Sequence, residues 1–273
     1  GSGTSGDTGG DGGQTGSASD SFGAAETEYS TAEDVDTAGN PEYSQLVMED
    51  PTGTVVTFTN ADVTASDSGE VTNMSFTDDD TGETVAFEAT GTSAQDAQSA
   101  SDLGVHWGRW AEGDYNVTRD GETVTTHGDF HYAYVDQLTT TAQLESLEGQ
   151  VTYNFADGTT PTDHNGDAWT LQNLTMDVDF NIGQIQGADL ALEDASGSRF
   201  ELSEDFSVSA RPVFFVPLEG SFDHADGAVA TTDAEGVLSG QFAGDKAEGA
   251  AVVYRVQDDE RTVFVTGSGL LRR

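Results

Sequence analysis

The segment from 104 to 267 alternates apolar and polar residues in one short stretch after another. The alternation is clearest in 147–155, Leu-Glu-Gly-Gln-Val-Thr-Tyr-Asn-Phe, where odd positions are apolar or Gly and even positions are polar. A period of two is typical of a strand that buries one face. Turn residues separate the stretches, and no amphipathic helix pattern is long enough to cover a sheet. The sequence therefore predicts an all-β fold of antiparallel strands, closed as a barrel or packed as a sandwich.

Two local features modify individual strands. Between 168 and 181 the apolar positions change from odd to even numbers. A bulge near 172–173 would restore one inward face, so we expect one there. Pro212 and Pro217 bracket 213–216. Because proline has no N–H to donate to a ladder, this segment is expected to be an edge or bent strand.

Composition divides the chain into four parts. Residues 1–44 are rich in Gly, Ser and acidic residues, which predicts a flexible, disordered tether without a core. Residues 45–90 form a small β-rich segment, 91–103 a small and polar linker, and 104–273 the main antiparallel β domain. The β-branched and aromatic stretches of the second part are 54–59, 71–76 and 84–88.

The chain is strongly acidic. It carries 50 Asp and Glu residues against nine Lys and Arg, a formal net charge of -41. In 1 M salt the electrostatic screening length is only roughly 3 Å, and the repulsion between the acidic residues nearly vanishes. The composition therefore favours a salt-adapted bacterium as the source. Nucleic acids and anionic membrane surfaces require clustered basic residues, and both are excluded as partners.

Cysteine and long apolar runs are both missing from the sequence. The lack of Cys excludes disulfides, thiolate metal sites and a cysteine nucleophile. No stretch approaches the roughly 20 apolar residues of a membrane-spanning helix. We expect any export signal to lie upstream of Gly1, and tethers of this composition often follow the lipid-bearing Cys of bacterial lipoproteins. An interdomain linker or a cloning remnant is the alternative for the first residues.

Several segments resemble known barrel proteins. Residues 240–254, Gly-Gln-Phe-Ala-Gly-Asp-Lys-Ala-Glu-Gly-Ala-Ala-Val-Val-Tyr, resemble the terminal hairpin of the transferrin-binding protein B type of barrel, with its G-x-F-x-G-x-x-A turn. Segments 104–110, 130–139 and 149–162 are similar to the C-terminal barrel-like region of some bacterial FecR-domain proteins. The resemblance covers roughly 104–269 and implies an eight-stranded antiparallel barrel on an exported, often lipid-anchored, surface protein. No transferrin-contacting loop residue can be placed here, so transferrin binding is not carried over.

Aromatic residues near Arg109 are the candidate binding residues. Trp107 and Arg109 fall on one face of a strand and Trp110 on the other, while Tyr132 and Tyr134 share a face of a later strand. An exposed Trp–Arg pair can stack on a sugar or on an aromatic ring of a protein partner. The alternative is that the aromatic rings fill the core and that Arg109 pairs with a carboxylate. The expected ligand is an unidentified protein or glycan.

Calcium is the cation that two acidic loops suit best. The five His residues show no zinc-site spacing. Oxygen ligands gather in one loop at Asp78 and Asp80, and in another at Asp163, Asn165 and Asp167. Neither loop keeps the EF-hand order, so solvated turns are the alternative to calcium binding. No other cofactor is expected.

Catalytic motifs are missing as well. The sequence has no G-x-S-x-G elbow and no glycine-rich phosphate loop before a helix. We therefore expect a non-enzymatic binding protein, exported to the cell surface or the outer membrane, with a membrane contact only through an N-terminal lipid anchor. The alternatives are an assembly module that polymerises or docks by strand addition through 45–90, and a carbohydrate-active enzyme. The sequence sets neither the ligand nor the oligomeric state.

Overall fold

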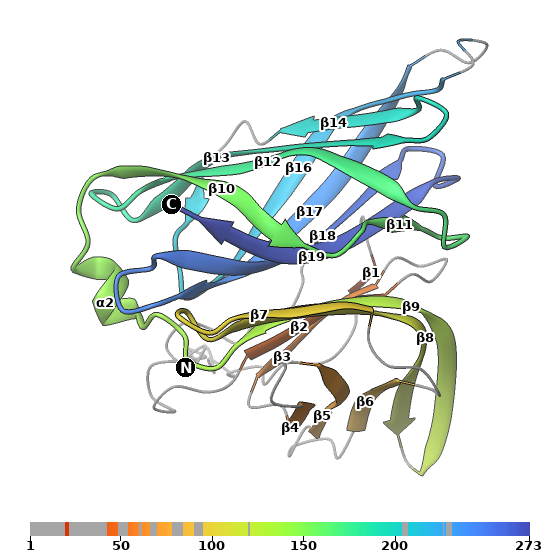
Figure 1. Ribbon diagram of the computed structural model, residues 1–273, viewed down its shortest axis with the longest axis horizontal. Coiled ribbons are helices and arrows are strands. Elements are labelled where there is room, and N and C mark those ends of the chain that lie inside the picture. The colour runs from red at the N-terminus through yellow and green to blue at the C-terminus, as the bar shows by residue number, and fades with distance from the viewer. Residues whose placement is uncertain are drawn as a thin grey trace, which may run out of the picture.

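The computed structural model shows two antiparallel sheets and, within the described part of the chain, one short helix (Figure 1). The described residues are 20–21, 43–48, 54–59, 62–65, 70–77, 84–89, 95–119, 121–203, 207–225, 227 and 231–273. Most of the expected tether lies outside them. Its described part includes β1 (Asp20–Ser21), which pairs with β3 (Thr54–Thr59).

Eight strands close into an antiparallel barrel. Neighbouring strands pair in the order β10, β12, β13, β14, β16, β17, β18 and β19, and β19 returns to β10, with Asn154 opposite Arg272. Two short strands sit beside this ring: β11 (Thr162–Asp163) pairs with β19, and β15 (Val208–Ser209) pairs with β13. The barrel strands are β10 (Gln150–Gly158), β12 (Trp169–Asp179), β13 (Gln184–Asp194), β14 (Arg199–Ser203), β16 (Val213–Asp223), β17 (Thr232–Ala243), β18 (Gly249–Asp258) and β19 (Phe264–Arg272). The predicted all-β, eight-stranded antiparallel barrel is therefore confirmed.

Side chains from all eight strands fill the barrel interior. They form one buried apolar cluster, in which Phe200 stacks on Phe222 with ring centroids 4.4 Å apart and Trp169 lies against Phe200. On the other side of the interior, Phe242 packs against Tyr153. This filling is what the alternating pattern requires, since each strand sends every second residue inward.

One of the two expected local irregularities is present. The pairing of β12 with β13 shifts register between Leu171 and Asn173, which is the predicted bulge. Residues 213–218 pair with β17, whereas the pairing of β16 with β14 ends at Glu219. Residues 204–206, which follow β14, lie outside the described part of the chain, so the expected edge or bent strand at 213–216 stays a prediction.

The first sheet contains more of the chain than the sequence predicted. Its order is β1, β3, β2, β9, β8, β6, β5 and β4, with β7 paired to β8. The predicted linker holds the strand β7, and β8 and β9 pair here although the main domain was expected to begin at 104. The barrel pairing begins only at Gln150. The remaining strands are β2 (Tyr43–Met48), β4 (Asp62–Ala65), β5 (Val71–Thr77), β6 (Thr84–Ala89), β7 (Gln95–Ala100), β8 (Val105–Arg119) and β9 (Glu122–Val135).

The first sheet packs against the outside of the barrel (Figure 1). Trp107, Ala133 and Val135 of the sheet share a buried cluster with Val253 and Leu270 of the barrel. Strand β18 is consequently buried at every position, because one face points into the barrel and the other meets the sheet. The barrel wall formed by β17, β18 and β19 is thus a second interface in addition to the interior.

A short helix, α2 (Thr141–Glu145), covers one end of the barrel. Thr140 caps it: its hydroxyl accepts the Gln143 N–H at 3.2 Å, and the Gln143 side chain accepts the Thr140 N–H at 2.8 Å. This reciprocal capping box allows so short a helix to form. Leu144 points into the barrel core. No helix among the described residues is long and apolar enough to cross a membrane.

Candidate functional site

Trp110 and Tyr132 lie in the core of the first sheet. The Trp110 Nε1 donates to the Val71 carbonyl at 2.7 Å, and the Val71 N–H donates to the Tyr132 hydroxyl at 3.1 Å. Both side chains are fully buried, and burial raises the pKa of Tyr132 to about 12. These two predicted binding residues therefore clamp the start of β5 and have no surface for a ligand.

The other three predicted binding residues also contact groups of the protein itself: Trp107, Arg109 and Tyr134. The barrel wall covers the Trp107 ring, which is only 2% exposed. Tyr134 stacks on His106 with ring centroids 4.5 Å apart. Arg109 forms an ion pair with Asp129 instead of lying over an aromatic ring at the surface. The structure brings the five predicted residues onto β8 and β9, but covers the faces that a sugar or partner would use.

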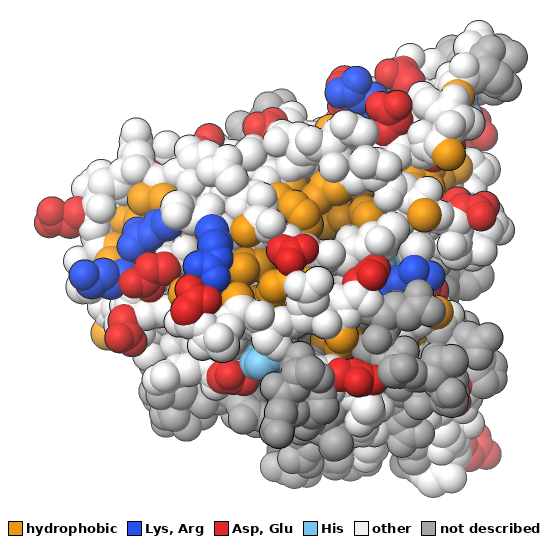
Figure 2. All heavy atoms as spheres, viewed as in Figure 1, with side chains coloured by type: hydrophobic (Ala, Val, Ile, Leu, Met, Phe, Trp, Pro, Cys, Tyr) orange, Lys and Arg blue, Asp and Glu red, His pale blue; other side chains and the backbone are white. Residues whose placement is uncertain are grey.

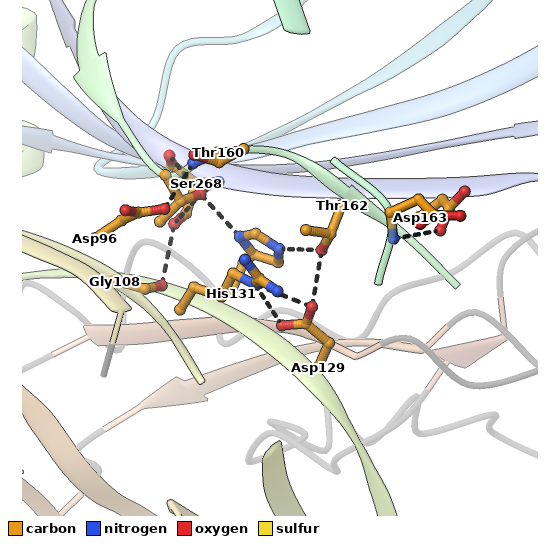
Figure 3. A network of polar contacts seen from close by, with 11 residues as sticks. Asp96, Gly108, Asp129, His131, Thr160, Thr162, Asp163 and Ser268 are labelled. Carbon is orange, nitrogen blue, oxygen red and sulfur yellow. Dashed lines mark hydrogen bonds and ion pairs between the residues drawn. The ribbon is translucent and has the colours of Figure 1, made fainter. Parts of the chain in front are cut away.

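A buried polar network joins the sheet to the barrel (Figure 3). His131 of β9 contacts two threonine hydroxyls, that of Thr159 at 2.8 Å through Nδ1 and that of Thr162 at 2.9 Å through Nε2. The Thr162 hydroxyl also donates to Asp129 at 3.1 Å. The Ser268 N–H of β19 donates to the Thr159 hydroxyl at 3.0 Å. The side chains of His131, Asp129, Thr159 and Thr162 are therefore all hydrogen-bonded in this network, as buried polar groups require.

His131 is neutral in the folded protein near pH 7. Burial lowers its pKa to about 4, mainly because the charged ring would lose its hydration, and Arg109 acts in the same direction. The neighbouring carboxylates of Asp129 and Asp96 oppose this shift. A neutral imidazole has one donor and one acceptor nitrogen, which suits two hydroxyl partners. The geometry therefore serves to join the two sheets.

Ser99, His106 and Asp136 form a hydrogen-bonded line that the sequence did not reveal. The Ser99 hydroxyl lies 2.8 Å from His106 Nδ1, and His106 Nε2 lies 2.9 Å from an Asp136 oxygen. A nucleophile, a base and an orienting carboxylate occur in this order in hydrolases. Here Ser99 and His106 are directly opposite each other in the β7–β8 pairing, and the Asp136 side chain is 60% exposed. Water weakens the interaction of so exposed a carboxylate with the imidazole ring.

The loop that holds the second calcium candidate is folded around Asp163. Its Oδ1 accepts the Asn165 N–H at 2.8 Å and the Asp167 N–H at 3.0 Å. These bonds use a carboxylate oxygen to close the turn. Among the described residues, no three His, Cys, Asp or Glu side chains are grouped as metal ligands. Asp78 and Asp80 lie outside the described part of the chain, and calcium binding stays a prediction.

A cavity of about 510 Å³ opens at the barrel end that carries α2. We call it the barrel-end pocket. Leu144, Phe180, Ile182 and Ala210 supply its apolar wall, and Arg211 is the basic residue of its lining. The volume lies in the range of roughly 300–1,000 Å³ that is usual for small-molecule sites. The arrangement can therefore hold a small molecule that has both apolar and polar parts.

No protein-family model matches the chain, and neither does any curated protein. Similar solved structures include a Trp-to-Ala variant of the vaccine antigen transferrin binding protein B from Haemophilus parasuis Hp5, at 13% identity and a TM-score of 0.42. Isotype 1 transferrin binding protein B from serogroup B Neisseria meningitidis is similar at 10% identity and a TM-score of 0.43. Each alignment covers 85% of this chain but 44% of the other, so the chain spans less than half their length.

A further similar structure is an enzyme by name. Kievitone hydratase from Nectria haematococca matches at 12% identity and a TM-score of 0.26, covering 94% of this chain and 96% of that one. Transferrin-binding protein B structures, the family that the sequence resembles, are thus among the similar solved structures, at low identity.

Sequence reasoning missed both the pocket and the network for identifiable reasons. The motif Thr140-x-x-Gln143 is a capping-box signal that could have located α2 and hence one wall of the pocket. Thr159, Thr162 and Ser268 carry no such signal, because isolated hydroxyl residues are equally suited to a solvent-exposed strand face. Only the packing of the sheet against the barrel buries them.

Proposed function

We propose that this chain is a non-enzymatic binding protein that uses its barrel as a rigid scaffold and the barrel-end pocket as its ligand site. The observation that supports this most is the contrast between the filled barrel interior and the open cavity at the α2 end. A packed interior favours contact with ligands at loops and ends instead of the lumen.

The proposal includes export to the cell surface of a salt-adapted bacterium, with the N-terminal segment as a tether. The net charge of -41 and the Gly- and Ser-rich start of the chain support this part of it. The proposed ligand is a protein or a glycan that the protein meets at the cell surface, or a fragment of either that can enter the barrel-end pocket.

A second candidate function is assembly by strand addition. β1 and β4 are the two end strands of the first sheet in the described part of the chain, where each pairs with a neighbour on one side. Free strand edges can accept a strand of another chain. Light scattering in high salt distinguishes the two: a monomer favours the binding module, whereas ordered polymers favour assembly.

Two measurements test the main proposal. Proteinase K added to intact cells of the producing organism should degrade the protein, and degradation only after lysis would contradict surface display. Hydrolysis of p-nitrophenyl acetate should be the same for the protein and its Ser99→Ala variant. An esterase activity that disappears in the Ser99→Ala variant would overturn the non-enzymatic reading, because it would assign the Ser99–His106–Asp136 line a catalytic role.

A further inference from the structure

We infer that the barrel-end pocket binds a compact molecule with an apolar body and an anionic group, the apolar body against Ile182 and its neighbours and the anion on Arg211. The inference rests on the proposed binding function and gives its site a ligand chemistry. It does not depend on where the protein is displayed.

The apolar wall of the pocket is continuous from the core to the surface. Leu144 and Phe180 belong to the buried barrel core and form its inner part. Ile182, at the turn between β12 and β13, is 56% exposed and extends the wall outward. A lone exposed Ile is ordinary on a protein surface. This one borders a cavity whose inner wall is already apolar, so a ligand that covers Ile182 removes apolar surface from water.

The walls of the pocket are fixed by hydrogen bonds of the backbone. The Ala210 N–H donates to the Gly183 carbonyl at 2.9 Å, and the Phe180 N–H donates to the Gly149 carbonyl at 2.9 Å. The Asn181 side chain accepts the Gly149 N–H at 3.1 Å. These bonds tie the β12–β13 turn to the strand that begins after α2 and to the segment before β16. The pocket is therefore preformed, which reduces the entropy lost on binding.

Basic residues are concentrated at this end of the barrel, among acidic residues such as Glu145, Asp245 and Glu248. Four of the nine basic residues lie here: Arg211 before β16, Lys246 in the β17–β18 turn, and Arg272 and Arg273 at the end of β19, which pairs with the start of β18. Figure 2 shows several Lys and Arg side chains on the left of the molecule, where Figure 1 places α2, with Asp and Glu side chains beside them.

Arg211 is the member of this group that is available to a ligand in the pocket. Arg272 is held by Asp102, with nitrogen–oxygen distances of 2.9 and 2.7 Å. Among the described residues, none forms an ion pair with Arg211, and Glu145 on the α2 side is the only acidic residue in the pocket lining. A guanidinium binds carboxylate or sulfonate oxygens through paired N–H donors, which gives the anionic group a defined position.

Two fluorescent dyes with related ring systems separate the apolar and the anionic contributions. 8-Anilinonaphthalene-1-sulfonate carries a sulfonate, whereas N-phenyl-1-naphthylamine is its neutral counterpart. We expect the protein to bind both dyes and Arg211→Gln to weaken only the anionic dye, by about tenfold, the size of one charge-assisted hydrogen bond. Ile182→Asp should weaken both dyes and leave the circular dichroism spectrum unchanged, because Ile182 is exposed.

The matched control is Arg199→Gln, which removes the same charge at the first residue of β14, at the opposite end of β13 from the pocket. It should leave the affinity for both dyes unchanged. Failure of the protein to bind either dye, or equal affinities in the folded Ile182→Asp variant, would overturn the pocket assignment. Unchanged sulfonate affinity in Arg211→Gln would overturn the anion assignment. Neither result bears on surface display, which the protease experiment tests separately.

Discussion

Arg109 Nε lies 2.8 and 2.9 Å from the two carboxylate oxygens of Asp129, on the face of the first sheet that the barrel covers. The side chains are 14% and 9% exposed, so the pair is largely removed from water. Thr162, from the segment beside β19, donates to the same carboxylate. The pair is therefore part of the contact between the two sheets as well as of the β8–β9 hairpin.

Removing the Asp129 carboxylate should destabilise the protein strongly. In Asp129→Ala, the guanidinium of Arg109 stays buried without its counter-charge, and the expected loss is about 3–5 kcal/mol in the free energy of unfolding. Denaturant unfolding followed by tryptophan fluorescence measures it. The double variant Arg109→Met/Asp129→Leu should lose less than Asp129→Ala, because no charge is left buried. A double variant that is the least stable of the three would contradict this account.

The stability of the protein should depend on pH through His131. Its pKa is about 4 when folded and 6.5 in the unfolded chain, so the unfolded state binds the proton more readily. The stabilisation is fully present above pH 6.5 and decreases as the pH falls from 6.5 to about 4, by roughly 3 kcal/mol in total. In His131→Asn, the free energy of unfolding should change less over this interval than in the unmodified protein.

Three ionisable side chains lie near His131 and act on it electrostatically: Asp129, Asp96 and Arg109. The comparison between variants therefore isolates the contribution of the imidazole. His164→Asn, in the exposed 164–166 turn, is the control and should keep the original pH dependence. Identical pH profiles for His131→Asn and the unmodified protein would show that the imidazole is not held neutral.

Gly240 should not tolerate a side chain. A Cβ at this position would lie 2.2 Å from the Phe214 ring, which covers the glycine from the neighbouring strand. Gly240→Ala is expected to destabilise the barrel by about 1–3 kcal/mol, as overpacking of a filled core does. Gly187→Ala is the matched control, since a Cβ there meets no atom within 4 Å. Similar melting temperatures for the two variants would show that the ring moves aside without cost.

Salt should stabilise the protein. With 50 acidic and nine basic residues, like charges repel across the folded surface. The distance over which charges interact falls from roughly 10 Å at 0.1 M to roughly 3 Å at 1 M salt. Most of the decrease in repulsion is therefore expected below about 1 M. The melting temperature should therefore rise steeply with NaCl over this range and more slowly above it. A melting temperature that is flat or falls between 0.1 and 1 M would contradict the proposed salt adaptation.

The alternating residues of 147–155 and the phase change near 172–173 were sufficient to predict strands and a bulge. Both patterns report which side of a strand is apolar, and that property depends on neighbours only two residues away. The aromatic residues near Arg109 were harder to interpret. A Trp on a half-buried strand is consistent with a ligand surface or with a core, and the sequence contains nothing that decides between them.

The sequence by itself determined that the chain forms antiparallel β-strands with an acidic exterior, because alternation and charge are properties of local residue order. The tertiary structure alone decided which strands pair. It assigned β8 and β9 to the first sheet, and it buried Trp107 and His131 by placing the barrel wall over them. Pairing partners and the packing of one sheet on another depend on residues far apart along the chain, and a period of two is the same whichever strand lies alongside.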